Sequence, residues 1–492
     1  MPYKTDQKRS FPNYSWAWPR GSVEDLIRAA AWADGAKAAA LFQSWMKNHD
    51  IDAVTHAEHR LLVSVASRFP EQQVPVDHRP RLMGLQRMLW SKSRFSLKAA
   101  EPALKKLRNA GIDVLVFKGA ARSAMNMADL KGRIAHDVDI LVRHSDFKTA
   151  LRLLMDDNWR ASNGRSAAYC QAAAAAIRGI NLFRGEFGDI DLHQRLLHQY
   201  TVLDDSEEDV WGRAQSVSFL GCDVYVASPT DQLIIAIAHG GLDGHSHSDW
   251  MVDCAHLVAD NDIDWDLFVS TCKRLGIMAH AAIVLSFMVS RLDADIPQRI
   301  LDLVVTSGRR PFLSLCSALF QAHPKHEHNL FGLGGRTLAK QARLYKARRQ
   351  VRRATDLQTI VLRPLRRTKG LKDAPPRMLL HDIDVPAGAR SMSIVVEFEA
   401  CPAKRRFMLE LNEGSVHLAS LTYRHSGAKG PVTLHANLDI PVRMNGKGFS
   451  ATMESRPSQY LKHPGDADEV LRYNAMPFAI LDVTFTLADG VS

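Results

Sequence analysis

The feature that most constrains the fold is the stretch of residues 114–142, VLVFKGAARSAMNMADLKGRIAHDVDILV, which begins and ends with a short apolar run. Short apolar runs bounded by polar or turn residues are typical of strands, so both ends are predicted strands. Lys118 and Gly119 follow the first of them and precede a helix expected at 120–127. A glycine at such a turn lets a phosphate approach the backbone, and the helix N-terminus offers N–H donors. The alternative is an ordinary strand-to-helix turn.

Two aspartates stand at the start of the second predicted strand. Alternate side chains of a strand share a face, so Asp137 and Asp139 are expected to point to the same side. Their Cα atoms would lie roughly 6–7 Å apart, which lets both carboxylates reach one divalent cation or two neighbouring ones. Aspartate is depleted in strands, and two on one face repel each other without a cation or base between them. The pair therefore predicts a metal site, with a solvated end of the strand as the alternative.

A predicted hairpin downstream carries more acids. Its strands are expected at 179–184 and 188–193, joined by a short turn. In the second strand Asp189, Asp191 and His193 share one face. An acid from this strand could supply the third ligand of a two-metal phosphoryl-transfer site. His193 is expected to be a packed histidine or one that supports the ligands.

These motifs, in this order and with Arg133 before the aspartate pair, resemble the bacterial nucleotidyltransferase family of the DNA polymerase β-like superfamily. The resemblance covers roughly residues 95–275. It implies an Mg²⁺-dependent enzyme (or one using Mn²⁺) that moves a nucleoside monophosphate from an NTP such as ATP to a hydroxyl acceptor and releases pyrophosphate. It further implies two sets of site residues. The metal-binding and catalytic set is Asp137, Asp139 and Asp191, and the nucleotide-binding set is Lys118, Gly119, Ala120, Arg122 and Arg133.

Three details of the resemblance stay open. The superfamily's glycine is usually followed by glycine or serine, whereas this chain has Ala120, so a serine contact to phosphate would be missing. Asp189 could replace Asp191 as the third acid, although the Leu-His that follows Asp191 favours the latter. Arg122 and Arg133 could orient a carboxylate instead of neutralising phosphate.

Two alternative functions are compatible with the same sequence. The first is a non-catalytic nucleotide- or RNA-binding module on this fold. The second is a metal hydrolase that uses His239, His245 and His247, although their spacing lacks the helical HExxH pattern.

A chain of 492 residues is long enough for several domains. We expect an α+β protein with a nucleotidyltransferase-like mixed sheet flanked by helices. N-terminal helices, one of them at 22–46, would precede the sheet, a further helical region would follow it, and an all-β sandwich-like domain would come last. The expected regions are an N-terminal helical region at 1–94, a catalytic core at 95–228, a substrate-side helical region at 229–330, a basic linker at 331–377 and a β-rich domain at 378–492.

The positive charge of the chain is concentrated in one segment. Residues 336–372 hold thirteen Lys and Arg and one acid, a net +12, so the remaining residues sum to −2 against a total of +10. This segment could contact nucleic acid or an anionic surface, or be a solvated helix between domains. No apolar run approaches the ~20 residues that a transmembrane helix needs. The six cysteines form no CxxC pair. We therefore expect a cytoplasmic protein.

Overall fold

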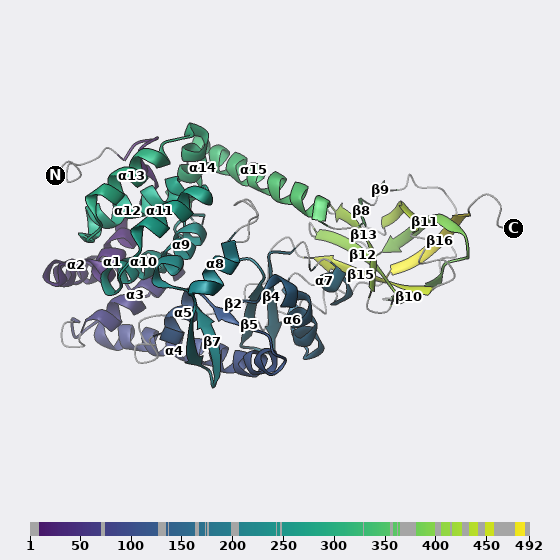
Figure 1. Cartoon of the computed structure of the whole chain (residues 1–492), viewed down its shortest axis with the longest axis horizontal. Helices are drawn as coiled ribbons and strands as arrows, with labels where there is room; N and C mark the ends of the chain where they lie inside the picture. The colour runs from purple at the N-terminus through teal and green to yellow at the C-terminus, as the bar shows by residue number, and fades with distance from the viewer. Residues whose placement is uncertain are drawn as a thin grey trace. The chain divides into compact units, whose positions relative to one another are not determined.

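The computed structural model (Figure 1) describes residues 9–69, 74–125, 134–135, 137–162, 167–172, 174, 177–197, 206–242, 244–246, 248–327, 329–354, 358–361, 363–364, 380–398, 405–413, 416–425, 432–440, 448–456 and 478–487. The fold is α+β, as predicted, with a mixed seven-stranded sheet, surrounding helices and further β-sheets near the C-terminus. Contacts divide the chain into two compact units, Met1–Arg143 with His193–Arg349 and His144–Leu192 with Gln350–Ser492. The region boundaries expected from the sequence stay a prediction.

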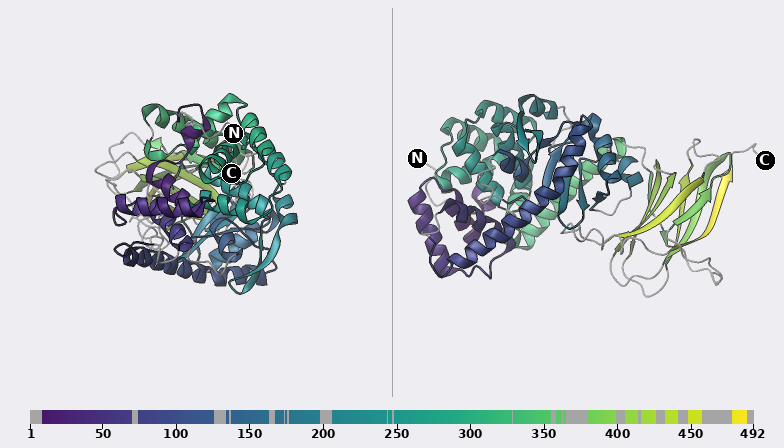
Figure 2. Two further views of the ribbon diagram at one scale, coloured as in Figure 1. Left: turned by 90° about the vertical axis from the view of Figure 1, so that its left-hand side faces the viewer. Right: turned by 90° about the horizontal axis from the view of Figure 1, so that it is seen from below.

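The first elements in the described part of the chain are helices. They are η1 Tyr14–Ala17, α1 Gly21–Ala31, α2 Gly35–Asn48, α3 His56–Arg68 and α4 Arg79–Asn109. The single helix expected at 22–46 was wrong, because Asp34 caps a new helix by accepting a hydrogen bond from the Lys37 backbone. The long helix α4 continues through Pro102 and packs against two strands of the sheet (Figure 2).

The seven-stranded sheet has the order β3-β4-β5-β2-β1-β7-β6. Its strands are β1 Leu115–Val116, β2 Val138–Leu141, β3 Arg160–Ala161, β4 Gly179–Arg184, β5 Gly188–His193, β6 Gln215–Phe219 and β7 Cys222–Val226. Strand β1 is antiparallel to β2 and parallel to β7, so the sheet is mixed. The helices within this part of the chain are α5 Lys118–Met125, α6 His144–Asp156, α7 Ala167–Ala172 and α8 Ser206–Arg213. Strands β1 and β2 are fully buried, which explains why their residues are apolar apart from Asp139 in β2.

A helical region follows the sheet. Its helices are α9 Pro229–Gly240, α10 Asp249–Asp260, α11 Trp265–Arg274, α12 Met278–Leu292, α13 Gln298–Gly308, α14 Phe312–Ala322, η5 Lys325–Glu327 and α15 Leu330–Ala354. Side chains of α9 to α14 share one hydrophobic core with those of η1 and α1 to α3. The basic segment predicted at 336–372 lies on α15 as far as residue 354, and most of its remainder is outside the described residues.

The C-terminal strands form two further sheets, in the orders β10-β15-β12-β13-β8 and β16-β11-β14-β9 (Figure 2). Their bounds are β8 Gln358–Val361, β9 Arg363–Pro364, β10 Leu380–Asp384, β11 Ala389–Phe398, β12 Arg405–Glu413, β13 Val416–His425, β14 Val432–Asp439, β15 Gly448–Arg456 and β16 Phe478–Leu487. Alternate residues are buried along β11 (Met392, Ile394, Val396) and along β14 (Leu434, Ala436, Leu438). This alternation is typical of a sandwich, as predicted.

No helix within the described ranges is both long enough and apolar enough to cross a lipid bilayer.

Candidate metal and nucleotide site

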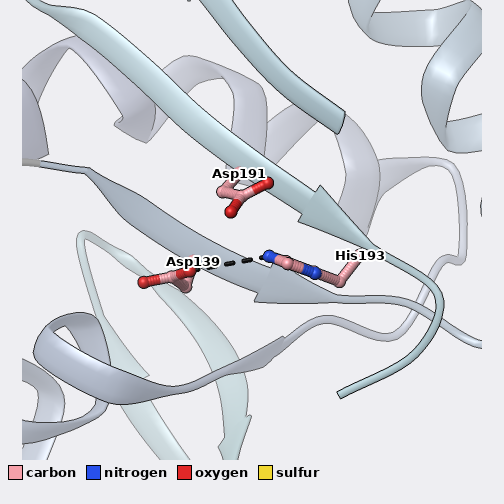
Figure 3. A group of neighbouring side chains, drawn as sticks. All are labelled: Asp139, Asp191 and His193. Carbon is pink, nitrogen blue, oxygen red and sulfur yellow. Dashed lines mark ion pairs between the residues drawn. The ribbon is translucent and has the colours of Figure 1, made fainter. Parts of the chain in front are cut away.

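Two carboxylates and one imidazole converge in the middle of the seven-stranded sheet. One ligand atom from each of Asp139, Asp191 and His193 lies within 4.8 Å of the ligand atoms of the other two (Figure 3). Asp139 is 2% exposed, His193 is 0% exposed and Asp191 is half-buried. Oxygen and imidazole nitrogen atoms at these separations fit the donor set of a divalent cation.

The sheet order brings these residues together. Asp139 lies on β2, Asp191 and His193 lie on β5, and β2 and β5 are hydrogen-bonded neighbours. The backbone N–H of Val142, just after β2, donates to the His193 carbonyl over 2.9 Å. Asp191 and His193 share a face because they are two residues apart on one strand. The alternation predicted along β5 is therefore confirmed, because Asp191 and His193 lie on the same face of the strand.

Lys118 contacts the same carboxylate. Its Nζ lies 2.5 Å from Oδ1 of Asp139, and Nε2 of His193 lies 3.5 Å from that oxygen. Lys118 has φ +53°, in the left-handed region that non-glycine residues seldom adopt. Such backbone strain costs about 1 kcal/mol or more and clusters at functional sites. The strained first residue of α5 thus places an ammonium group on a buried acid.

Gly119 and Ala120 occupy the start of α5. A Cβ atom added at Gly119 would lie 3.7–3.8 Å from atoms of Ile134 and Ala135, which is ordinary van der Waals contact. The fold by itself therefore leaves room for alanine at position 119. Ala120 is fully buried, so a serine at this position would place its hydroxyl in the protein interior.

The remaining acids of the predicted set lie outside the group in Figure 3. Asp137 is half-buried in the bend before β2 and does not belong to the described group of possible metal ligands. Its role as a ligand stays a prediction. Asp189 accepts a hydrogen bond from the Asn181 amide over 3.2 Å. Of the two acids left open on β5, Asp191 is the one that joins Asp139.

Arg122 contacts α10 and not the carboxylate group. Its Nε lies 3.7 Å from Oδ1 of Asp253, and its NH2 lies 3.2 Å from Nδ1 of His256. Burial, and next the charge of Arg122, hold the pKa of His256 below 6.5. This arrangement matches the alternative in which the arginine orients a carboxylate. Arg133, the other predicted phosphate ligand, lies outside the described residues.

The histidines of the alternative hydrolase site bind backbone carbonyls. Nε2 of His239 lies 2.6 Å from the Leu196 carbonyl, and Nε2 of His245 lies 2.9 Å from that of Ala17. His247 is outside the described residues. In the part of the chain that the structure describes, His239 and His245 do not belong to a group that could hold a metal.

Two motifs downstream support the fold around the site. Asp231, near the start of α9, accepts two hydrogen bonds of 2.9 and 2.8 Å from Arg213, and this contact raises the pKa of the guanidinium. Trp250 on α10 packs directly against Gly240 on α9, where an added Cβ would lie 2.1 Å from the indole. The glycine is required because no side chain fits between this helix and the indole ring.

Sequence reasoning missed two relationships in the site. It expected Lys118 to bind phosphate, and the structure shows its ion pair with Asp139. It gave His193 a packing or supporting role, which stays a prediction, and it did not foresee that a ring nitrogen lies close to the oxygens of two carboxylates. The common face of Asp191 and His193 was the signal that could have included the histidine.

Comparison with known proteins adds one match. Residues 49–293, about half of the chain, match the sequence model of a family described as uncharacterised nucleotidyltransferase. The match begins before α3 and runs to the end of α12, so it includes the whole seven-stranded sheet and the Asp139, Asp191 and His193 group. Neither a curated protein nor a solved structure gives a match. The chain belongs, through residues 49–293, to the uncharacterised nucleotidyltransferase family.

Proposed function

We propose that this protein is a metal-dependent nucleotidyltransferase that moves a nucleoside monophosphate from an NTP to a hydroxyl group of an acceptor and releases pyrophosphate. The observation that carries the proposal is the convergence of Asp139, Asp191 and His193 beside the strained start of α5. The family match supports nucleotidyl transfer as the class of reaction.

The buried acids fit a divalent cation, for which the sequence leads us to expect Mg²⁺ or Mn²⁺. Asp139 and Asp191 would hold it, and Asp137, two residues before Asp139, is proposed as a further ligand. A divalent cation at such a site neutralises phosphate oxygens and lowers the pKa of an attacking hydroxyl. Asp139 is suited to this role because a buried carboxylate is stable only beside a positive charge.

Lys118 and Gly119 are proposed to bind the triphosphate. The Lys118 side chain is 28% exposed, so its ammonium group touches both solvent and the buried Asp139. A flexible lysine in this position can exchange a carboxylate for a phosphate oxygen with little movement of the backbone. Gly119 would let phosphate approach the first N–H groups of α5.

The proposal is tested with the full chain, α-labelled NTPs and fractions of a host-cell lysate as acceptors. We expect labelled nucleotide to be transferred with release of pyrophosphate, and Asp139→Asn to lower the rate at least about 100-fold, since the removal of a charged group at such a centre costs several kcal/mol. Asp156→Asn, an exposed acid of α6, is the matched control and should leave transfer unchanged.

Titration of metal and NTP against the same variants separates the proposal from its alternative. NTP binding that depends on Asp139, without pyrophosphate release in any fraction, would identify a nucleotide-binding module. Failure to bind any NTP would overturn both readings.

A further inference from the structure

We propose that His193 is a direct ligand of the cation and makes the site prefer a transition-metal ion such as Mn²⁺ to Mg²⁺. This inference rests on the proposed function and deepens it. Asp139 and Asp191 alone would leave Mg²⁺ and Mn²⁺ nearly equivalent, because both ions accept carboxylate oxygens. An imidazole among the ligands removes that equivalence.

The distance between His193 and Asp139 suits two ligands of one ion. Nε2 of the histidine lies 3.5 Å from Oδ1 of the aspartate, longer than the separations of up to about 3.2 Å usual for an N–H···O hydrogen bond. Two donor atoms that each lie about 2.1 Å from a cation, at a right or tetrahedral angle, are about 3–3.5 Å apart. The observed spacing therefore fits shared coordination better than a histidine that only orients the carboxylate.

Packing holds the imidazole in this position, and a backbone hydrogen bond holds the strand that carries it. Its ring makes an edge-to-face contact with Phe117, with centroids 5.0 Å apart and an interplanar angle of 73°. Its backbone carbonyl accepts a hydrogen bond from Val142, next to the strand that carries Asp139. Both His193 and Phe117 are fully buried, so the ring is fixed by packing before any ion binds. Figure 3 shows its nitrogen directed at the Asp139 carboxylate, with Asp191 beside it.

The chemistry of the donor set decides which ion is favoured. Mg²⁺ takes oxygen ligands and retains water, whereas imidazole nitrogen suits first-row transition ions. The group offers two carboxylates and one imidazole nitrogen. A site of this composition binds Mn²⁺ more tightly than Mg²⁺, and the nitrogen supplies the difference.

The decisive measurement uses the wild-type chain with Mn²⁺ alone, without nucleotide. Electron spin-echo envelope modulation should show hyperfine coupling of the ion to a directly bound imidazole nitrogen, and the pattern should change when the protein is made with ¹⁵N-histidine. Because no variant is involved, failure of a mutant to fold cannot confuse the result. A bound Mn²⁺ without this coupling would overturn the inference.

Variants then assign the nitrogen. His193→Gln should abolish the coupling and narrow the Mn²⁺-over-Mg²⁺ preference at least about tenfold, the lower range for changes at metal sites. His144→Gln, an exposed histidine at the start of α6, is the matched control and should keep the wild-type spectrum. Circular dichroism of each variant confirms that it is folded.

The outcomes separate this inference from the proposed function. Mn²⁺ that binds through Asp139, supports transfer and shows no nitrogen coupling would overturn the role of His193 and leave the nucleotidyltransferase proposal standing. Lack of binding of either ion to the wild-type chain, with or without NTP, would overturn both. An unchanged Mn²⁺-over-Mg²⁺ preference in folded His193→Gln would overturn the claim of selectivity.

Discussion

Nζ of Lys118 lies 2.5 Å from Oδ1 of Asp139, the oxygen that also faces Nε2 of His193. An ammonium group and a metal cation cannot occupy the same side of one carboxylate oxygen, so the lysine and the ion compete. The lysine thereby neutralises the buried acid and offsets the cost of its desolvation while no metal ion is bound.

Lys118→Met should therefore affect metal and nucleotide in opposite directions. Mn²⁺ binding without nucleotide should tighten several-fold, because a competing positive charge is removed. NTP affinity should fall about tenfold, because a charge-assisted contact to phosphate is lost. Both constants can be measured by calorimetry, with Lys148→Met on the exposed face of α6 as the control. A Mn²⁺ affinity equal to that of the wild type would show that the ion pair does not compete.

Gly119→Ala should separate folding from ligand binding. The added methyl group meets only ordinary contacts with Ile134 and Ala135, and alanine favours a helix over glycine by up to about 1 kcal/mol. Thermal stability should thus be kept or slightly raised, while NTP affinity falls because phosphate can no longer approach the backbone. If this variant bound nucleotide as tightly as the wild type, Gly119 would not be part of the nucleotide-binding site.

Gly240→Ala is the opposite case. Its Cβ would lie 2.1 Å from the ring of Trp250, so the helices α9 and α10 would have to move apart. We expect a loss of about 3 kcal/mol or more, typical of severe overpacking. Denaturant unfolding of the two glycine variants side by side measures the contrast. A similar midpoint for both would mean that the helix pair adjusts freely.

Acid should destabilise the first unit through His256. Burial and Arg122 hold its folded pKa below the unfolded value of 6.5, so the unfolded chain binds more protons as the pH falls through 6.5. The contribution of His256 to the free energy of unfolding is therefore complete above pH 6.5. It decreases as the pH falls below 6.5 and does not change further once the pH is below the folded-state pKa. Unfolding measured from pH 7.5 to 5.5 should show this slope, and His256→Gln should reduce it. The pKa of His323 is also lowered, so this histidine should account for part of the pH dependence that remains in the His256→Gln variant.

Arg213→Met should destabilise the start of α9 without altering the metal site. It would leave Asp231 buried at 2% exposure without its two hydrogen bonds from the guanidinium. Since Arg213 is itself partly exposed, we expect a loss of about 2 kcal/mol, below the 3–5 kcal/mol of a fully buried pair. Arg274→Met, which alters a surface pair with Asp209, should change stability by less than about 0.5 kcal/mol.

Local patterns in the sequence predicted much of the sheet and part of the site. Apolar runs gave the buried strands β1 and β2, and alternation along β5 placed Asp191 and His193 on one face. The break between α1 and α2 was missed because the apolar spacing continues across it, although Asp34 and Gly35 are a cap and turn signal. The contacts of Lys118 and Arg122 could not be predicted from the sequence. Each depends on a partner brought close by the tertiary fold, and the first also depends on a left-handed backbone.

The contact between Gly240 and Trp250 means that substitutions at these two positions have to occur together during evolution. A relative that gained a side chain at 240 would have to shrink the aromatic residue at 250 in the same lineage, or lose the packing of α9 on α10. Position 119 has no such steric restriction, so it can accept other residues in any relative that no longer binds phosphate. Among proteins descended from this chain, a glycine conserved at position 240 together with a variable residue at position 119 would therefore indicate that the fold was kept after nucleotide binding was lost.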